Sequence, residues 1–535
     1  MKLFFRAFII ALVTALTFAV VIHAESRGKA LKRAEKELRA GNFEQAEAIY
    51  NDLLTKNQDD KEARMGLSFS LLKQNKLIPS FEAAAQIVAT DSLNGRAFGL
   101  MGTALLRSGE FRTSLQSLLT ALKLDNKDHL ALAGLAELEY FEHRTRNAYD
   151  ALQRAIQLEP REPDYYVSQA RVCSRLELYS EAADAYQNFL SVAPKTDEER
   201  RARIRGLIDF YRYLGTTKLH RQSGPDVVTI PFELHGNRPF ITVKINNKQT
   251  LRFVIDTGAS LSVISDKAAE KLSIKPIARG GHARAVGGSG EFGIVYGLLD
   301  SVSFGEAKVD LVPAYIRTVH SPANAPDAER ADGYIGLSVL SNFAVTIDYK
   351  EKKLILDRTP LKEEDVAATT TAPSTAAPVT PIVPPMLDDK INIPLRSTSG
   401  GLASAEGLLD GHEKPFNFII DTGASTTVIS KSAVKRFSLE NMKLKNMIFQ
   451  VVGAAGVEND VEALGLASLT VNNLRQRNAR ALILNLDPVN ETSGFEQHGI
   501  IGGDFLRHFL VHLDLRQFKF HLTPQGGGIE RIVSK

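Results

Sequence analysis

Between residues 27 and 196, small residues recur along the chain at a constant interval of 34 residues. One small position in each repeat is occupied by Ala46, Ser80, Ser114, Ala148 and Ala182, and a second by Ala34, Ser68, Gly102, Ala136 and Ala170. Two small positions in each repeat allow two helices to pack closely, while apolar residues such as Tyr50 and Tyr186 fill the space between pairs. The pattern predicts five helix pairs, capped by a further helix over roughly 197–214.

From Asp226 onward, short apolar runs rich in β-branched residues replace the helical pattern, which predicts strands. A similar order of strands, a short helix and a closing hairpin occurs twice. In the first copy the strands are expected over 227–232, 240–245 and 251–255, the helix over 266–272 and the hairpin over 343–356. In the second copy a strand over 416–420 precedes a helix over 431–437 and a hairpin over 509–522. The pattern predicts two mainly-β lobes, 226–358 and 389–526.

The segment between the two lobes, residues 359–388, is rich in Pro, Thr and Ala. Its apolar content is too low to form a core of its own. Because proline keeps a chain extended, we expect this segment to act as a tether between the lobes.

The N-terminus resembles a targeting segment. Lys2 and Arg6 precede an apolar run from Ala7 to Ile22, and Ala24 is a possible cleavage site. This order is typical of a signal peptide, and the length of the run also allows an uncleaved signal anchor. Basic residues that follow the run favour the cytoplasmic side and argue against simple export. We interpret residues 1–24 as a signal peptide or anchor, with the body outside the cytoplasm (periplasmic or extracellular) and possible membrane anchoring; a buried N-terminal helix is the alternative.

Composition excludes several functions. A formal net charge of +3 over 535 residues gives no reason to expect nucleic-acid binding. Cys173 is the single cysteine, so neither an intrachain disulfide nor a cysteine-based zinc site can form. The sequence therefore does not indicate whether the protein lies in an oxidising or a reducing compartment.

The same chemical motif occurs once in each lobe. Asp256-Thr257-Gly258 and Asp421-Thr422-Gly423 each follow an apolar strand. Two aspartates brought within about 3 Å cannot both ionise, so they share a proton. One can then act as a base toward water while the other acts as an acid toward a carbonyl oxygen.

These strings resemble the retropepsin-like (clan AA) aspartic proteases, including their bacterial members, because each Asp-Thr-Gly-Ala-Ser is followed by an apolar-apolar-Gly triplet. The triplets end at Gly336 and Gly502, with the preceding Ile residues expected behind the loops. The constant spacing of the small residues resembles tetratricopeptide repeats. The resemblance implies a multidomain chain with an all-α tetratricopeptide solenoid followed by two mainly-β acid protease lobes. It also implies that Thr257 and Thr422 cross-link the two loops, with Gly258 and Gly423 allowing the turns.

A covering flap is expected in each lobe between the Asp and the later Gly. The glycine-rich turns suited to such a lid contain Gly287 and Gly288 in the first lobe, and Gly453 and Gly456 in the second. Simple tight turns are the alternative.

The sequence thus predicts an aspartic endopeptidase in which Asp256 and Asp421 activate a water molecule, with no metal and no organic cofactor. The alternative is a catalytically inactive peptide-binding scaffold on the same folds. A polypeptide substrate is implied, together with a protein partner at the repeats; the repeats could instead be a spacer. We expect the lobes to pair within one chain, whereas pairing between two chains remains the alternative.

Overall fold

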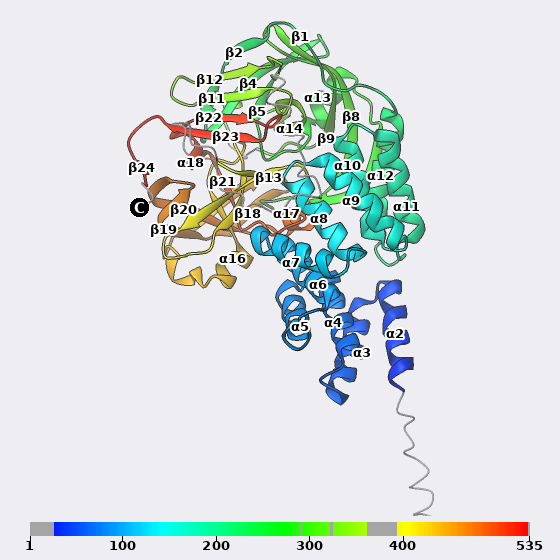
Figure 1. Cartoon of the computed structure of the whole chain (residues 1–535). Coiled ribbons are helices and arrows are strands. Elements are labelled where there is room, and N and C mark those ends of the chain that lie inside the picture. The colour runs from blue at the N-terminus through cyan, green and yellow to red at the C-terminus, as the bar shows by residue number, and fades with distance from the viewer. Residues whose placement is uncertain (1–25, 289, 322–324, 361–392, 533–535) are drawn as a thin grey trace, which may run out of the picture.

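The computed structural model describes residues 26–288, 290–321, 325–360 and 393–532. The predicted signal segment and nearly all of the predicted tether lie outside these residues. Figure 1 shows a helical solenoid beside two β lobes.

The repeats form consecutive antiparallel helix pairs, as the spacing predicts. The pairs are α2 (Arg27–Ala40) with α3 (Phe43–Lys56), α4 (Lys61–Lys73) with α5 (Leu77–Thr90), α6 (Gly95–Arg107) with α7 (Phe111–Leu124), α8 (His129–Phe141) with α9 (Thr145–Leu158), and α10 (Pro163–Arg175) with α11 (Tyr179–Val192), followed by the capping helix α12 (Glu198–Leu214). The small positions Ala34, Ala46 and Ser68 are fully buried between helices. Asp60, Asn94 and Asp128 occupy the same position in successive repeats, and each caps a helix by accepting a hydrogen bond from a backbone N–H in the first turn.

The first lobe is built on a twisted sheet. Its strands are β1 (Arg221–Ser223), β2 (Val227–Pro231), β3 (Glu233–His235), β4 (Arg238–Ile245), β5 (Gln249–Ile255), β6 (Ser262–Ser265), β7 (Ala278–Arg284), β8 (Glu291–Phe304), β9 (Ala307–Arg317), β10 (Gly333–Ile335), β11 (Ala344–Asp348) and β12 (Lys353–Asp357), with helices α13 (Asp266–Leu272) and α14 (Leu337–Leu340) and a 3₁₀ turn, η1 (Asp327–Glu329). In the main sheet, β10 runs parallel to β5. Asn246 and Asn247 form the turn between β4 and β5 with φ of 52° and 55°.

The second lobe repeats this plan. Its strands are β13 (Leu395–Ser397), β14 (Ala403–Leu409), β15 (Phe416–Ile420), β16 (Val428–Ser430), β17 (Phe449–Gly453), β18 (Gly456–Val461), β19 (Ala463–Val471), β20 (Leu474–Leu484), β21 (Gly499–Ile501), β22 (Phe509–Asp514), β23 (Lys519–Pro524) and β24 (Ile529–Arg531), with helices α16 (Lys431–Arg436), α17 (Asp487–Ser493) and α18 (Gly503–Leu506) and a 3₁₀ turn, η2 (Leu439–Met442). Here β21 runs parallel to β15, as β10 does to β5.

The two closing hairpins join the lobes into one body. Strand β11 pairs antiparallel with β22, so that Ile347 lies opposite Val511 in a sheet of order β2-β12-β11-β22-β23. The buried apolar side chains on both sides of this sheet form one continuous core. The sequence predicts both hairpins but not their pairing with each other.

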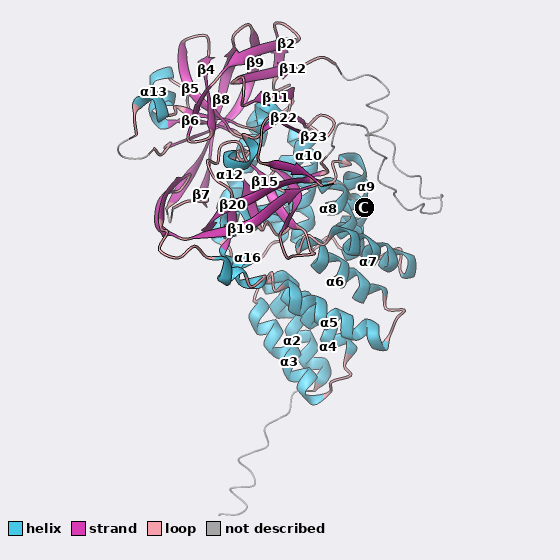
Figure 2. Cartoon of the chain, turned by 90° about the vertical axis from the view of Figure 1, so that its left-hand side faces the viewer, coloured by secondary structure: helices cyan, strands magenta, loops and turns pink. Residues whose placement is uncertain are grey.

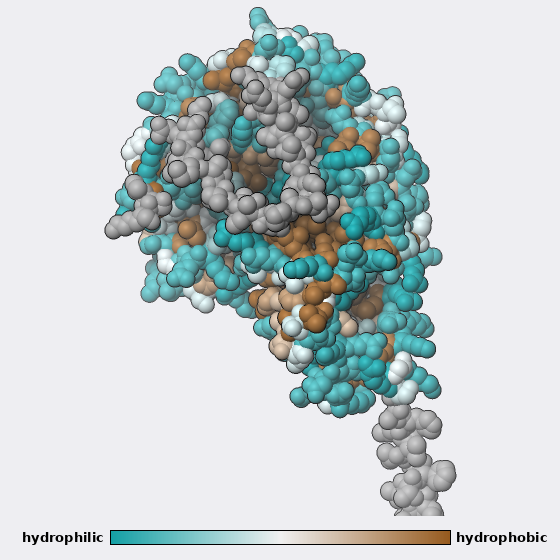
Figure 3. Space-filling view, in the orientation of Figure 1, coloured by the Kyte–Doolittle hydropathy of each residue, from teal (hydrophilic) through white to brown (hydrophobic). Residues whose placement is uncertain are grey.

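The solenoid packs against both lobes (Figures 1 and 2). Phe495 of lobe two inserts edge-on between Phe111 and Phe141, with ring centroids 4.8 and 5.0 Å away. On the other side, α12 lies so close to β7 that a Cβ added to Gly206 would lie 2.3 Å from the Cα of Gly280. The repeats therefore pack directly against both lobes instead of being joined to them only through the chain. Figure 3 shows hydrophobic side chains gathered on one face where the solenoid meets the lobes.

Among the described residues, no helix is both long enough and apolar enough to cross a membrane.

Candidate active site

The two Asp-Thr-Gly loops meet at the interface of the lobes. Strand β5 delivers Asp256, whose backbone N–H donates to the carbonyl of Ile335 at 3.0 Å; Asp421 after β15 donates in the same way to Ile501 at 3.0 Å. Each Asp is thus held by the apolar-apolar-Gly strand of its own lobe. The prediction that these Ile residues lie behind the loops agrees with this arrangement.

Only glycine fits at the turn of each loop. A Cβ added to Gly258 would lie 2.3 Å from Oδ2 of Asp421, and one added to Gly423 would lie 2.5 Å from Cγ of Asp256. The main chain of each lobe therefore approaches the carboxyl group of the other. A side chain at either position would push the carboxyl groups apart.

The threonines bind the two loops together reciprocally. The N–H of Thr257 donates to Oγ1 of Thr422 at 3.2 Å, and the N–H of Thr422 donates to Oγ1 of Thr257 at 3.0 Å. The hydroxyl of Thr257 donates to the carbonyl of Ile420, and that of Thr422 to Ile255, both at 2.7 Å. Both threonine side chains are buried. This network sets the distance between the aspartates.

The two carboxyl groups share one electrostatic environment. Burial, followed by the nearby charge of Asp421 and a hydrogen bond to it, raises the pKa of Asp256 well above its ordinary value. Burial also raises the pKa of Asp421, and backbone hydrogen bonds oppose that rise. Asp421 accepts from the N–H groups of Gly423 and Ala424 at 2.8 and 3.1 Å, whereas Asp256 accepts from Gly258 at 2.8 Å. The extra donor makes Asp421 the better site for negative charge of the two.

Two further residues hold the chain that follows each aspartate. Ser338 accepts a hydrogen bond from the N–H of Ser262 at 3.1 Å. Asp504, in the equivalent place, accepts from both the N–H and the hydroxyl of Thr427 at 2.8 Å. Both lie two residues after the later glycine of their lobe. That shared offset is the sequence signal that could have assigned them a positioning role.

The glycine-rich turns of the two lobes touch each other at their tips. The turn between β7 and β8 meets the turn between β17 and β18, where the N–H of Ala454 donates to the carbonyl of Val286 at 3.1 Å. A Cβ added to Gly287 would lie 2.7 Å from the Cα of Gly453. Gly288 and Gly456 have φ of 120° and 118°, which other residues rarely adopt.

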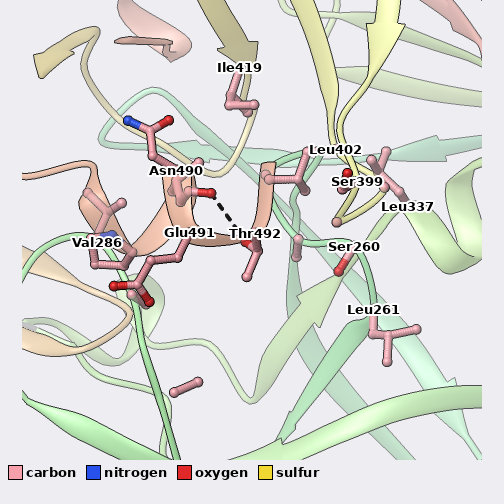
Figure 4. A pocket seen from close by; sticks show the side chains of 18 of the residues that line it. Ser260, Leu261, Val286, Leu337, Ser399, Leu402, Ile419, Asn490, Glu491 and Thr492 are labelled. Carbon is pink, nitrogen blue, oxygen red and sulfur yellow. Dashed lines mark hydrogen bonds between the residues drawn. The ribbon is translucent and has the colours of Figure 1, made fainter. Parts of the chain in front are cut away.

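A cavity of about 2210 Å³ extends from the aspartates to the concave face of the solenoid. Figure 4 shows part of its lining, with Ser260, Leu261 and Leu337 from lobe one near Ser399 and Leu402 from lobe two. Both Asp-Thr-Gly loops, both turn tips and side chains of α8, α10 and α12 line the same space. The cavity has about two to seven times the volume of a small-molecule site, which is about 300–1,000 Å³, and it suits a polypeptide segment.

Two arginines that the sequence analysis did not single out, Arg238 and Arg317, line the lobe-one side of the cavity together with Tyr334, the first residue of the triplet that ends at Gly336. Arg317 donates to the carbonyl of Ala454 at 2.9 Å and lies over the ring of Phe292, so it contacts both turns. The two arginines belong to no sequence motif, and only the fold brings them to the aspartates.

In the described part of the chain, no three His, Cys, Asp or Glu side chains are arranged to hold a metal ion. Cys173 is buried in α10, and burial raises the pKa of its thiol to about 11.

Two lobes that share a pair of Asp-Thr-Gly loops define the class of aspartic-protease-type sites. Comparison with protein families agrees, because an aspartyl protease model matches residues 241–339 and again 405–505, and a tetratricopeptide repeat model matches residues 31–90. The chain carries two aspartyl protease domains of the retropepsin-like type behind N-terminal tetratricopeptide repeats.

Among solved structures, the chain is similar to tetratricopeptide proteins. TTC0263 from Thermus thermophilus is 18% identical over 35% of this chain and 100% of that one, with a TM-score of 0.30. PilF of Pseudomonas aeruginosa is 18% identical over 35% and 90%, with a TM-score of 0.26. YrrB, described as having an unusual peptide-binding site, is 17% identical over 34% and 94%, with a TM-score of 0.22. Comparison with curated proteins gave no match.

Proposed function

We propose that this protein is an endopeptidase that hydrolyses peptide bonds with a water molecule activated between Asp256 and Asp421, without a metal or an organic cofactor. The observation that carries this proposal is the pair of carboxyl groups, one from each lobe, that meet between the two loops and line a single large cavity. Each carboxyl group belongs to a complete Asp-Thr-Gly loop.

The chemistry needs one ionised and one protonated carboxyl group. The carboxylate of Asp421 takes a proton from the water as its oxygen attacks the carbonyl carbon, while neutral Asp256 donates its proton to the carbonyl oxygen. The tetrahedral intermediate then collapses. The C–N bond breaks as the amine nitrogen takes the proton held by Asp421, and the gem-diol returns its proton to Asp256. The same pair is restored for another cycle.

The touching turns fit the role of flaps. Turn tips made of Gly287, Gly288, Gly453 and Gly456 would part to admit a chain and close over it, excluding bulk water from the aspartates. Arg317 would hold the closed state through its bond to Ala454.

The repeats would bind the polypeptide that the aspartates cleave. Their concave face lines the same cavity, which supports direct substrate binding over a distant spacer role. The concave groove of the repeats is partly filled, because Lys73 of α4 forms ion pairs across it with Glu162 and with Asp164, the latter at 2.7 Å. A substrate segment would therefore lie at the end of the groove that faces the lobes. Export or anchoring through residues 1–24 remains part of the proposal.

An inactive scaffold that only binds peptides is the competing function. Its supporting feature is the rigid attachment of the solenoid, which would suit binding alone. Both aspartates standing in intact loops favour catalysis.

The test is hydrolysis of an unfolded protein by the purified chain between pH 3 and 8, with and without a statine-type transition-state mimic. We expect cleavage at mildly acidic pH, inhibition by the mimic, and at least a thousandfold loss in Asp256→Asn and Asp421→Asn. Asp300→Asn, an exposed aspartate of the same lobe, is the matched control and should be fully active. No cleavage at any pH, with peptide binding retained in Asp256→Asn, would establish the scaffold instead.

A further inference from the structure

The sheet register places two arginines and a tyrosine around the lobe-one aspartate. Phe240 pairs with Val254, so Arg238, two residues earlier on β4, lies at the level of Asp256 at the end of β5. Tyr334 immediately precedes Ile335, whose carbonyl accepts from the N–H of Asp256.

Arg317 reaches the same region from the end of β9. Strand β9 runs parallel to β6, with Tyr315 opposite Val263, and Val263 is itself opposite Tyr334 of β10. Arg317 and Tyr334 both line the cavity together with Asp256. The fold thus gathers these groups beside the aspartate from three separate strands.

Within the described residues, neither arginine has a carboxylate partner. The side chain of Arg238 lies over the ring of Phe240, and its Nε atom is buried without an acceptor among those residues. Arg317 uses its guanidinium for the single carbonyl of Ala454. Arg252 of the neighbouring strand also has a buried Nε without an acceptor in the described chain, but its charge is balanced by Glu233 at 2.5 Å. A buried donor without an acceptor is unfavourable, so Arg238 is suited to bind an anion. Arg317 donates to one carbonyl and carries a charge that no described carboxylate within ion-pair distance balances, so it is suited to the same anion.

The two aspartates do not supply enough negative charge to balance the guanidinium groups of Arg238 and Arg317. The pair holds one shared proton and hence one negative charge, which backbone N–H groups stabilise on Asp421. Two guanidinium groups facing one distributed charge leave an excess of positive charge beside Asp256. A substrate carboxylate would balance it.

We propose that Arg238 and Arg317, with the hydroxyl of Tyr334 beside them, form a subsite for a carboxylate of the bound polypeptide close to the scissile bond. The planar fork of a guanidinium matches the two oxygens of a carboxylate. The carboxylate would come from an Asp or Glu side chain of the substrate or from its free C-terminus. This subsite rests on the proposed function and adds the substrate class that the cleft would select.

The test uses matched peptides, each cleaved by the full chain. One arm replaces Glu by Gln at each position near the scissile bond, and the other compares a C-terminal acid with the C-terminal amide. We expect at least a tenfold higher kcat/KM for the acid in one of the two arms, and that arm identifies the source. Arg238→Gln and Arg317→Gln should bring the ratio to about one, and Arg238→Lys should keep part of it. Because Arg317→Gln also loosens the flap contact, the ratio and not the absolute rate is the readout.

Arg252→Gln is the matched control, since it removes an arginine of the same sheet that does not line the cavity, and it should keep the wild-type ratio. A wild-type ratio near one in both arms would overturn the subsite while leaving hydrolysis standing. If no peptide is cleaved, the proposed function fails, and the affinities of the Asp421→Asn variant for the same peptide pairs decide the subsite. Equal affinities there would overturn it.

Discussion

Phe495 offers the sharpest test of whether the repeats are part of the protease body. Its side chain is 2% exposed and lies between Phe111 and Phe141, and these three rings belong to one apolar cluster that spans the solenoid and lobe two. Truncating a buried Phe to Ala typically costs about 3–5 kcal/mol. Because the same substitution also removes two edge-to-face ring pairs, we expect a value in the upper half of that range.

The assay is denaturant unfolding of full-length Phe495→Ala, followed by fluorescence and by limited proteolysis between the repeats and the lobes. We expect a lowered midpoint for the step in which the solenoid separates, and faster cleavage near residues 215–225. Leu93→Ala is the matched control, because Leu93 is 76% exposed and its truncation should change stability by less than about 0.5 kcal/mol. A destabilisation below about 1 kcal/mol for Phe495→Ala would refute the packing argument.

The same interface changes how deletion of the repeats should be interpreted. A recruiting domain joined loosely to a protease could be removed without affecting cleavage of short peptides. Here, removal of residues 27–214 would uncover Phe495 and also Tyr296, which stacks on Phe210 of α12 at 4.6 Å. Loss of activity after deletion would therefore report damage to the lobes, and point variants are the better test of recruitment.

Three further predictions concern the aspartates and their loops. Thr257→Ala should cost about 1–3 kcal/mol of stability and most of the activity, because it leaves the N–H of Thr422 and the carbonyl of Ile420 without partners. Thr257→Ser should keep both hydrogen bonds, and equal thermal stability of the Ala and Ser variants would contradict this prediction. The raised pKa of Asp256 means that the folded state binds a proton more tightly than the unfolded state, so the stability from this group is present at low pH and is lost as pH rises through the folded pKa. Asp256→Asn should accordingly raise the melting temperature at pH 7 and have little effect near pH 3. An unchanged melting temperature at pH 7 would contradict this reasoning. A mixture of Asp256→Asn and Asp421→Asn should stay inactive, because both loops of one site come from one chain; restored hydrolysis would instead reveal pairing between chains.

The sequence by itself determined the local structure and the chemistry that repeats. A constant spacing of small residues specifies helix pairs because such residues must recur wherever two helices touch, and Ala34, Ala46 and Ser68 are buried accordingly. The duplicated Asp-Thr-Gly loops could be recognised because the turn next to a carboxyl group admits only glycine, as Gly258 and Gly423 demonstrate. Each of these constraints acts within a few residues or within one repeat, so it leaves a pattern in the sequence.

Only the tertiary structure decided how the parts meet. The pairing of β11 with β22 follows from which edge strands are left free once both lobes have formed, and nothing in either hairpin specifies its partner. Phe495 is an ordinary apolar residue in the sequence until the solenoid packs over it, and Arg238 and Arg317 are ordinary arginines until β4 and β9 bring them beside Asp256. Contacts between residues far apart in the chain depend on the shapes of finished surfaces. For that reason the sequence could predict the two aspartates, whereas the cavity around them and the arginines that line it could be found only in the folded structure.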